Sequence, residues 1–172
     1  TPQAAEARAL LPAIDKALAA EAEARAKEEA SRSLWSYSTH KDDMSGKSVQ
    51  WAEVVSSNTL EFDFPYNVVQ HGRLAIRRHP EHGLDVILQI EKGQIQCSSY
   101  DCPIRVVFDN GKPSTITGNE PADHDSTTVF LPSSLIARMA KAKEMRVQFN
   151  AFQEGAPTLI FPVKNLDRAR LK

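Results

Sequence analysis

The two cysteines of the chain, Cys97 and Cys102, are separated by four residues and lie between two runs that alternate apolar and polar side chains. Structural zinc sites use four ligands, and no second pair of Cys or His with zinc-type spacing accompanies these two. A thioredoxin-like redox site has a Cys-x-x-Cys motif at a helix start, whereas these cysteines lie between predicted strands. Cysteines that face each other across a short hairpin can form a disulfide. We therefore expect a disulfide, which favours an oxidising compartment such as the periplasm.

A second cluster with chemical potential is the loop Asp123, His124 and Asp125, in the stretch "PADHDS". Two carboxylates and an imidazole are the groups used for acid–base catalysis or for binding a hard cation. A calcium loop would add oxygen ligands at alternate positions and a distal Glu, which this stretch lacks. We expect Asp and Ser side chains to bond local backbone groups here, with a ligand site or a catalytic site as alternatives.

A pair of histidines, His79 and His82, resembles a metal-binding pair at first sight. They flank Pro80 and Gly83 in a predicted turn, so the helical spacing that would direct both imidazoles to one ion is absent. The sequence also contains no nucleophile-elbow motif, no Gly-rich loop that opens a helix, and no zinc-protease motif. We therefore expect turn residues here, and we expect no enzymatic activity, metal or cofactor for the chain.

Several aromatic residues are candidates for recognition of another protein. An exposed patch could form from Trp35, Tyr37, Trp51 and Tyr66, and the loop that follows Trp35 adds Asp43 and Met44. The alternative is that these rings close the core of a β-domain with their polar atoms at its rim. The candidate partner-binding residues are Trp35, Tyr37, Asp43, Met44 and Tyr66.

The elements that position these residues fall into two parts, the first covering residues 1–32. From Ala4 to about Arg32 the sequence is rich in Ala, Glu, Arg and Lys, which favour a helix, and Leu10, Ile14 and Leu18 recur at intervals of four, with Leu11 beside them. Because this apolar stripe is narrow and ends at Leu18, we expect a solvated tether or spacer. A short coiled coil or a helix that docks on a partner is the alternative.

The second part, residues 33–172, has the period-two pattern of an antiparallel β-domain. Alternation predicts that one face of each strand points inward. The residues expected on these inward faces are Leu60, Phe62, Phe64, Leu84, Val86, Leu88, Ile90, Ile104, Val106, Phe108, Val147, Phe149, Leu159, Phe161 and Val163. About eight strands are expected, which is enough for an antiparallel β-sandwich or barrel.

Two local signals interrupt or connect these strands. The pair Asn110-Gly111 predicts a tight hairpin turn in which both central residues have positive φ. In "LPSSLIARMAKAKEM" the alternation is lost, and Leu135, Ile136 and Met139 have helical spacing behind a cap at Ser133 or Ser134. We therefore expect one short helix within the β-domain.

Composition excludes some functions. The 172 residues are 41% hydrophobic and 25% charged, with a formal net charge of −1, so no basic surface field favours a nucleic-acid partner. No apolar run reaches the roughly 20 residues that cross a bilayer. The sequence begins at Thr1 instead of Met, so we expect that an upstream segment has been cleaved or trimmed, and whether that segment was a signal peptide or an anchor stays open.

The order of these features resembles that of an extracytoplasmic β-domain family of Gram-negative bacteria, whose members follow signal peptides, lipid anchors or membrane helices. The resemblance covers residues 34–163, and the ending "KNLDRARLK" departs from the family's Gly-Leu-aromatic ending. It implies a β fold, a periplasmic or otherwise extracytoplasmic location, and a distant similarity to accessory proteins of secretion systems. The segments that carry it are "WSYSTHKDDMSG", "SSNTLEFDFPY", "LDVILQIEKGQIQC", "CPIRVVFDNG", "EPADHD" and "FNAFQEGAPTLIFPV".

These observations favour a non-enzymatic binding or accessory module of the cell envelope. Its expected partner is another envelope or secreted protein, bound through strand edges or through the loop from Trp35 to Gly46. The second hypothesis is an immunity or inhibitor protein that blocks a secreted toxin or a cell-wall hydrolase. A third is an enzyme that acts through Asp123, His124 and Asp125.

Overall fold

The computed structural model describes residues 2–98 and 101–172, with side chains described from Leu11 to Glu29 and from Arg32 onward within those ranges. The chain divides into two compact units, and the division falls between Arg32 and Ser33. No described helix has the length and apolarity needed to cross a membrane.

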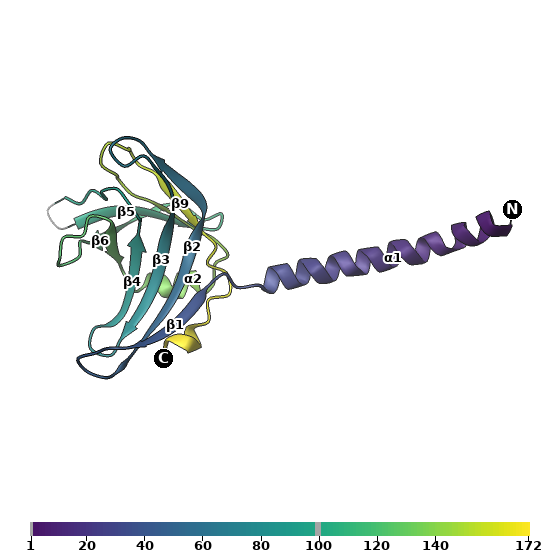
Figure 1. Cartoon of the computed structure of the whole chain (residues 1–172), viewed down its shortest axis with the longest axis horizontal. Coiled ribbons are helices and arrows are strands. Elements are labelled where there is room, and N and C mark those ends of the chain that lie inside the picture. Colours follow the sequence, from purple (N-terminus) through teal and green to yellow (C-terminus); the bar gives the residue numbers. More distant parts are fainter. Residues whose placement is uncertain (1, 99–100) are drawn as a thin grey trace. The chain divides into compact units, whose positions relative to one another are not determined.

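The first unit is the predicted helix, α1 (Pro2–Ser31), and Figure 1 draws it as one continuous coil. Its side chains include an i,i+4 ion pair, in which Arg25 donates to Glu21 over 3.0 Å. Leu11, Ile14 and Leu18 are each more than half exposed, and the side chain of Leu10 lies outside the described part. The helix is confirmed, and its role as a tether stays a prediction.

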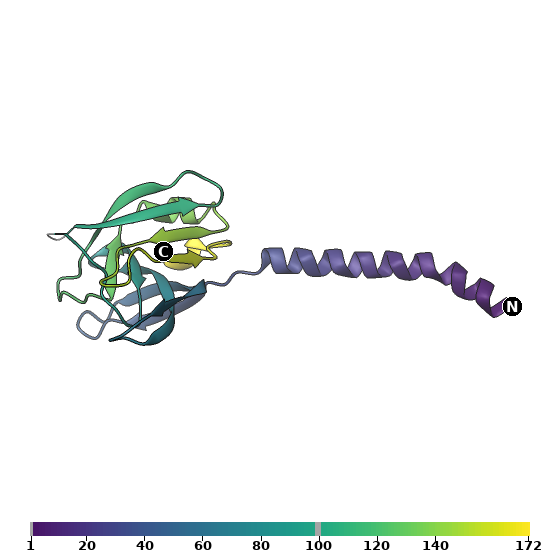
Figure 2. The ribbon, with the colours of Figure 1, turned by 90° about the horizontal axis from the view of Figure 1, so that it is seen from above.

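The second unit is a single antiparallel sheet of nine strands, one more than expected. The strand order is β1-β2-β3-β4-β7-β6-β5-β8-β9, and the sheet curls into a half-barrel (Figure 1). Figure 2 shows strands from residues 36–89 in one layer and strands from residues 101–161 in the layer opposite. The strands are β1 (Ser36–Lys41), β2 (Ser48–Phe62), β3 (Val68–His79), β4 (Gly83–Gln89), β5 (Asp101–Phe108), β6 (Ser114–Asn119), β7 (Thr128–Leu131), β8 (Met145–Gln148) and β9 (Thr158–Phe161).

Alternation identified most of the core correctly, because each strand turns one set of side chains to the inside of the curl. Leu88, Ile104, Val147 and Leu159 are all buried at these positions. Phe64 was wrongly expected among them: β2 ends at Phe62, and the turn that follows leaves Phe64 79% exposed. The period-two rule holds only as long as the strand continues.

The hairpin between β5 and β6 is confirmed, but its turn differs from the expected one. The residue with positive φ is Asp109, at 48°, and neither Asn110 nor Gly111 adopts that conformation. The N–H of Gly111 donates to the carbonyl of Phe108. The loop is therefore longer than a two-residue tight turn, because strand pairing resumes only at Ser114.

The short helix is also confirmed, as α2 (Leu135–Met139), with Leu135, Ile136 and Met139 buried. The expected serine cap is wrong, because the side chain of Ser134 makes no capping hydrogen bond. Instead, the N–H groups of Leu135 and Ile136 donate to the backbone carbonyls of Pro132 and Ser133. Backbone turns thus satisfy the first donors of the helix.

The predicted disulfide between Cys97 and Cys102 is confirmed. Ser98 and Asp101 exchange both backbone hydrogen bonds, so the neighbouring cysteines form a non-hydrogen-bonded cross-strand pair. Such pairs bring their Cα atoms closest together, and the two cysteine Cα atoms are 4.2 Å apart. The half-cystine Cys102 is fully buried, so the disulfide belongs to the edge of the core.

Candidate binding surfaces

The two ends of the sheet, β1 and β9, are the places where backbone hydrogen-bonding groups could remain unpaired. At β9 they are paired with side chains. Strand β2 carries an irregularity between Val55 and Thr59, and there the amide of Asn58 donates to the carbonyl of Thr158 while its oxygen accepts the N–H of Ile160. The Asn58 side chain therefore takes the place of a neighbouring strand and joins β9 to β2.

Two further contacts complete this seam between β2 and β9. The hydroxyl of Ser57 donates to the carbonyl of Ile160. A side chain at Gly72 would collide with Leu159, which is fully buried, so a glycine allows β9 to lie close to β3. The β9 edge is thus closed by polar side chains and by close packing.

The edge of β1 is open in the described part of the chain. Asp42 donates its N–H to Lys47, which closes the β1–β2 hairpin, and in an antiparallel pair the hydrogen-bonded positions alternate from there. The backbone groups of Tyr37, Thr39 and Lys41 therefore point away from β2. We call these three positions the β1 edge, and no described residue hydrogen-bonds their outward groups.

The β1 edge also has few of the features that protect edge strands. It contains no proline or bulge, and its single Lys, Arg, Asp or Glu side chain is Lys41, at the end of the strand. The residues from Ser38 to Lys41 are all exposed. The six-residue strand could therefore pair with a strand of another protein.

Beside this edge, the loop from β1 to β2 holds a fixed shape. The carboxylate of Asp42 accepts from the hydroxyl of Ser45 at 2.5 Å and from its N–H at 2.9 Å. These two hydrogen bonds, the hydroxyl first, lower the pKa of Asp42 from its ordinary value. At the tip of the loop Asp43 is exposed and Met44 is 95% exposed, so both candidate residues present free side chains.

The three aromatic candidates contribute less surface than expected. The indole of Trp35 is buried, with 6% exposure, and its Nε1 donates to the carbonyl of Val163, so the expectation that Trp35 belongs to an exposed patch is wrong. The hydroxyl of Tyr37 accepts the N–H of Asp167. Tyr66 is half-buried beside Phe62. All three rings close the rim of the core.

The C-terminal segment contacts the side chains of Trp35 and Tyr37: Val163 accepts from Trp35, and the guanidinium of Arg170 lies 4.3 Å from the ring centre of Tyr37. This segment ends in a short 3-10 helix, η1 (Arg168–Leu171), whose start is capped by the carboxylate of Asp167. Leu166 and Leu171 are buried against the core. The unusual ending of the sequence thus contributes to the fold, and it lies next to β1 in Figure 1.

A second candidate surface is the outer face of the sheet, which would be polar if it met only solvent. Ala75 in β3 and Ile87 in β4 point outward as cross-strand partners, yet they are only 3% and 9% exposed. The half-buried rings of Trp51 and Phe130 flank them. This face therefore carries a small apolar layer of its own.

Charged residues are fixed around this layer by ion pairs. The guanidinium of Arg77 lies 5.7 Å from the ring centre of Trp51 and 5.8 Å from that of Phe130. Its Nε and Nη2 both donate to Asp85 Oδ2, at 2.9 and 2.6 Å. A second, looser pair joins Arg73 to Glu53 over 3.7 Å. Both arginines of this face are thus paired with carboxylates of the protein.

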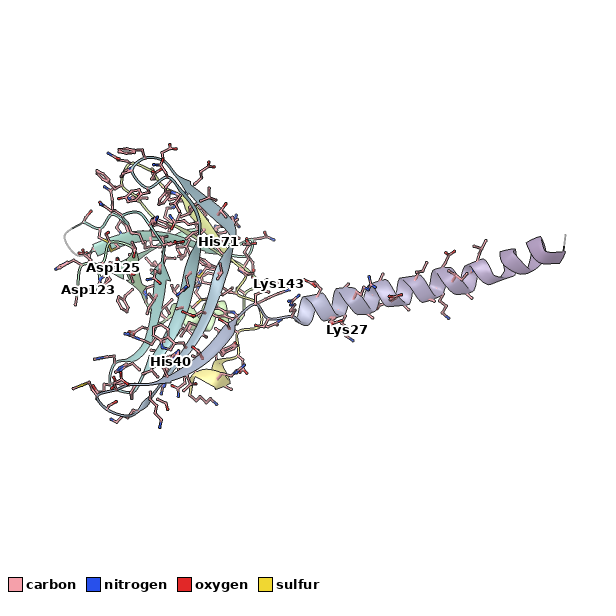
Figure 3. All side chains as sticks on the ribbon, in the orientation of Figure 1. Lys27, His40, His71, Asp123, Asp125 and Lys143 are labelled. Atoms are coloured by element: carbon pink, nitrogen blue, oxygen red, sulfur yellow. A yellow bond between two sulfur atoms is a disulfide. The ribbon has the colours of Figure 1, made fainter. Side chains whose placement is uncertain are left out.

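Three adjoining hollows run along the outer face, and together we call them the outer-face groove. The first hollow has a volume of about 370 Å³ and is lined by Ser38, His40 and Asp42, among others. It shares Trp51 and Glu53 with a central hollow of about 230 Å³. Arg73 and Gln89 in turn link the central hollow to a third of about 520 Å³, beside His71. His40 lines the first hollow and His71 the third, and Figure 3 shows them at opposite ends of the outer-face groove.

The Asp123–Asp125 loop, labelled in Figure 3, borders the outer-face groove, because Asp125 bonds Thr127 and Thr128, which line two of its hollows. Asp123 accepts the N–H of Asp125, and Asp125 in turn accepts from Thr127 and Thr128. The backbone and hydroxyl groups of Thr127, followed by the hydroxyl of Thr128, lower the pKa of Asp125. These are the local bonds expected of a structural loop, with threonines in place of serine.

The two histidines of the β3–β4 turn, His79 and His82, lie closer together than their spacing suggested. Their rings are stacked, with centres 4.4 Å apart, and His79 Nδ1 accepts the N–H of Glu81. Among the described residues, no three His, Cys, Asp or Glu side chains are arranged to hold a metal ion.

The outer-face residues Ala75, Arg77, Ile87 and Phe130 were not identified from the sequence. The signal was present: "LAI" in β3 and "VIL" in β4 interrupt the alternation with three consecutive apolar residues. Such runs indicate strands that are covered on both faces.

Comparisons with known proteins give few matches. No family model and no curated protein matches the chain. Among solved structures, the chain is similar to the crystal structure of invasion associated protein B from Bartonella henselae, with 18% sequence identity, coverage of 76% of this chain and 83% of that chain, and a TM-score of 0.46.

Proposed function

We propose that the chain is a non-enzymatic binding module of the bacterial cell envelope that pairs its β1 edge with a strand of another envelope or secreted protein. The proposal includes an extracytoplasmic location, a tether in α1 and an accessory role beside secretion machinery. The observation that carries it is the contrast between β9, whose outward groups are bonded to Asn58, and the β1 edge, whose outward groups are open.

Strand addition fits the chemistry of this edge. An added strand would receive hydrogen bonds from three consecutive outward positions, Tyr37, Thr39 and Lys41, which supply affinity with little dependence on sequence. Specificity would come from neighbouring side chains, of which Met44 is the most exposed. A disulfide on the same domain is consistent with an oxidising compartment.

The second candidate function is inhibition of a secreted toxin or cell-wall hydrolase. The observation that favours it is the loop that presents Met44 at 95% exposure on a backbone held by Asp42 and Ser45. A fixed loop with an apolar tip can enter an active-site cleft at low entropic cost.

A photo-crosslinking experiment tests the proposal. The side chain of Ser38 is exposed beside the β1 edge, so a photoreactive amino acid at this position should form one dominant adduct in the native cell envelope. The same probe at exposed Thr115 in β6 is the control and should not form this adduct. Thr39→Pro removes an outward N–H and should abolish the adduct, whereas Thr39→Ala keeps that N–H and should preserve it.

Two outcomes would contradict strand pairing. Equal adduct yield with Thr39→Pro and Thr39→Ala would show that the outward N–H of Thr39 takes no part in binding. A captured hydrolase whose inhibition is lost with Met44→Ala and kept with Thr39→Pro would replace the proposal with the inhibitor function.

A further inference from the structure

We propose that the outer-face groove is a binding site for an uncharged saccharide chain. This inference goes beyond the proposed function, because it concerns the face of the sheet and not the β1 edge. It rests on three features of the groove: its paired arginines, its aromatic rings and its length.

The charges of the groove argue for an uncharged ligand. An anionic polymer would need cations without protein partners, yet Arg77 is bound to Asp85 and Arg73 is paired with Glu53. The carboxylates of Asp42 and Glu91 also line the groove and would repel it. The acidic partners equally oppose a polyanion. An ion pair can still donate and accept hydrogen bonds: Arg77 uses Nε and Nη2 on one oxygen, so its Nη1 and Asp85 Oδ1 have no partner among the described residues.

The central hollow is lined by two half-buried aromatic rings, Trp51 and Phe130. The guanidinium of Arg77 lies over one side of each ring, 5.7 and 5.8 Å from the ring centres, and Ala75 and Ile87 beside them are almost fully buried. A pyranose ring has C–H groups on its faces and hydroxyls around its rim, so it can lie on an aromatic ring while planar side chains bind its hydroxyls. Glu53, Arg73 and Gln89 supply such groups at the border of this hollow.

The length of the groove argues for a chain of sugars. Outward residues of β3 line the groove along most of this strand. They are Val69, His71 and Arg73 in the third hollow, and Arg77 and His79 in the first. At about 3.4 Å per residue of strand, this stretch spans roughly 30 Å, long enough for several sugars in a row.

A peptide fits this face less well. The backbone groups of β2, β3 and β4 are engaged in the sheet, so an extended peptide would find no row of main-chain partners here. Main-chain partners lie at the β1 edge. We therefore assign the peptide to the edge and the saccharide to the face.

Isothermal titration of the full chain with three uncharged hexasaccharides, chitohexaose, cellohexaose and maltohexaose, tests the inference. We expect at least one to bind at micromolar to millimolar concentration. Trp51→Ala should weaken that binding at least tenfold, and Glu53→Gln, which keeps the shape of the side chain, should weaken it severalfold. Phe64→Ala, which removes an exposed ring outside the groove, should leave binding unchanged.

The result separates this inference from the proposed function, because Thr39→Pro should leave saccharide binding intact. Three outcomes would overturn the inference: no binding of any hexasaccharide up to millimolar concentration, equal affinity of wild type and folded Trp51→Ala protein, or tighter binding of charged oligogalacturonate or of a random-peptide library.

Discussion

The β1 and β9 edges of the same sheet differ in whether their outward backbone groups have hydrogen-bond partners. At β9, the amide of Asn58 in β2 bonds both Thr158 and Ile160, as a neighbouring strand would. At β1, Tyr37, Thr39 and Lys41 direct their backbone groups outward without such a partner among the described residues. The outward groups of β9 are therefore used within the domain, whereas those of β1 can pair with another protein. For this reason we propose that binding takes place at β1.

A matched pair of proline substitutions should show this difference most strongly. Ile160→Pro removes the N–H whose hydrogen bond Asn58 accepts, leaves that amide oxygen unsatisfied and should cost about 2–3 kcal/mol in free energy of unfolding. Thr39→Pro removes an N–H that serves no ladder bond and should cost less than about 1 kcal/mol. Denaturant titration of both variants measures the two costs, and equal costs would remove the distinction between the edges.

Removal of the Asn58 side chain should open the closed edge. Asn58→Ala leaves the part-buried Thr158 carbonyl and Ile160 N–H without partners, so we expect a loss of about 2–3 kcal/mol. Ser57→Ala, which removes one exposed bond to the same strand, is the matched control and should cost about 0.5–1 kcal/mol. A smaller loss for Asn58→Ala than for Ser57→Ala would show that Asn58 does not hold the seam.

The disulfide provides a reference that involves neither edge. Closing a loop of about six residues stabilises by roughly 2 kcal/mol, so the double variant Cys97→Ala/Cys102→Ala should melt about 4–8 °C lower with the fold retained. Scanning calorimetry and circular dichroism check this. Loss of the fold would mean that the disulfide supports the sheet far more than its loop length predicts.

The smallest effect is expected at Asp125, which is also remote from both edges. Because its pKa in the folded chain is lowered, its hydrogen bonds contribute stability above the ordinary value of 3.8 and lose it as the pH falls through the folded value. Asp125→Ala should therefore be about 1 kcal/mol less stable than wild type near pH 6, and the gap should narrow in acid. A gap that widens in acid would contradict the lowered pKa.

The sequence was sufficient for features that depend on neighbouring residues. Alternation located buried Val147 and Leu159, and spacing alone placed Cys97 opposite Cys102. Features that join distant segments could not be read in this way. Asn58 meets Thr158 across 100 positions, and Trp35 is buried because it reaches Val163, 128 positions away.

The candidate surfaces follow the same division. Met44 and Asp43 were identified as part of the loop from Trp35 to Gly46, and the structure leaves both exposed. The openness of β1 depends on which strands lie beside it, which local pattern does not specify. The apolar layer at Ala75 and Ile87 was visible as a break in alternation, but its ring partner Phe130 comes from β7, a distant strand.

Amide hydrogen exchange measured by NMR on the full chain tests the central claim most directly. If the β1 edge is open and the β9 edge is closed, the N–H of Thr39 should exchange at least a hundredfold faster than that of Ile160, although both lie in end strands of the sheet. Addition of the captured partner should then slow Thr39 and leave Ile160 unchanged. Equal protection of the two amides in the free protein would contradict an open β1 edge and a closed β9 edge.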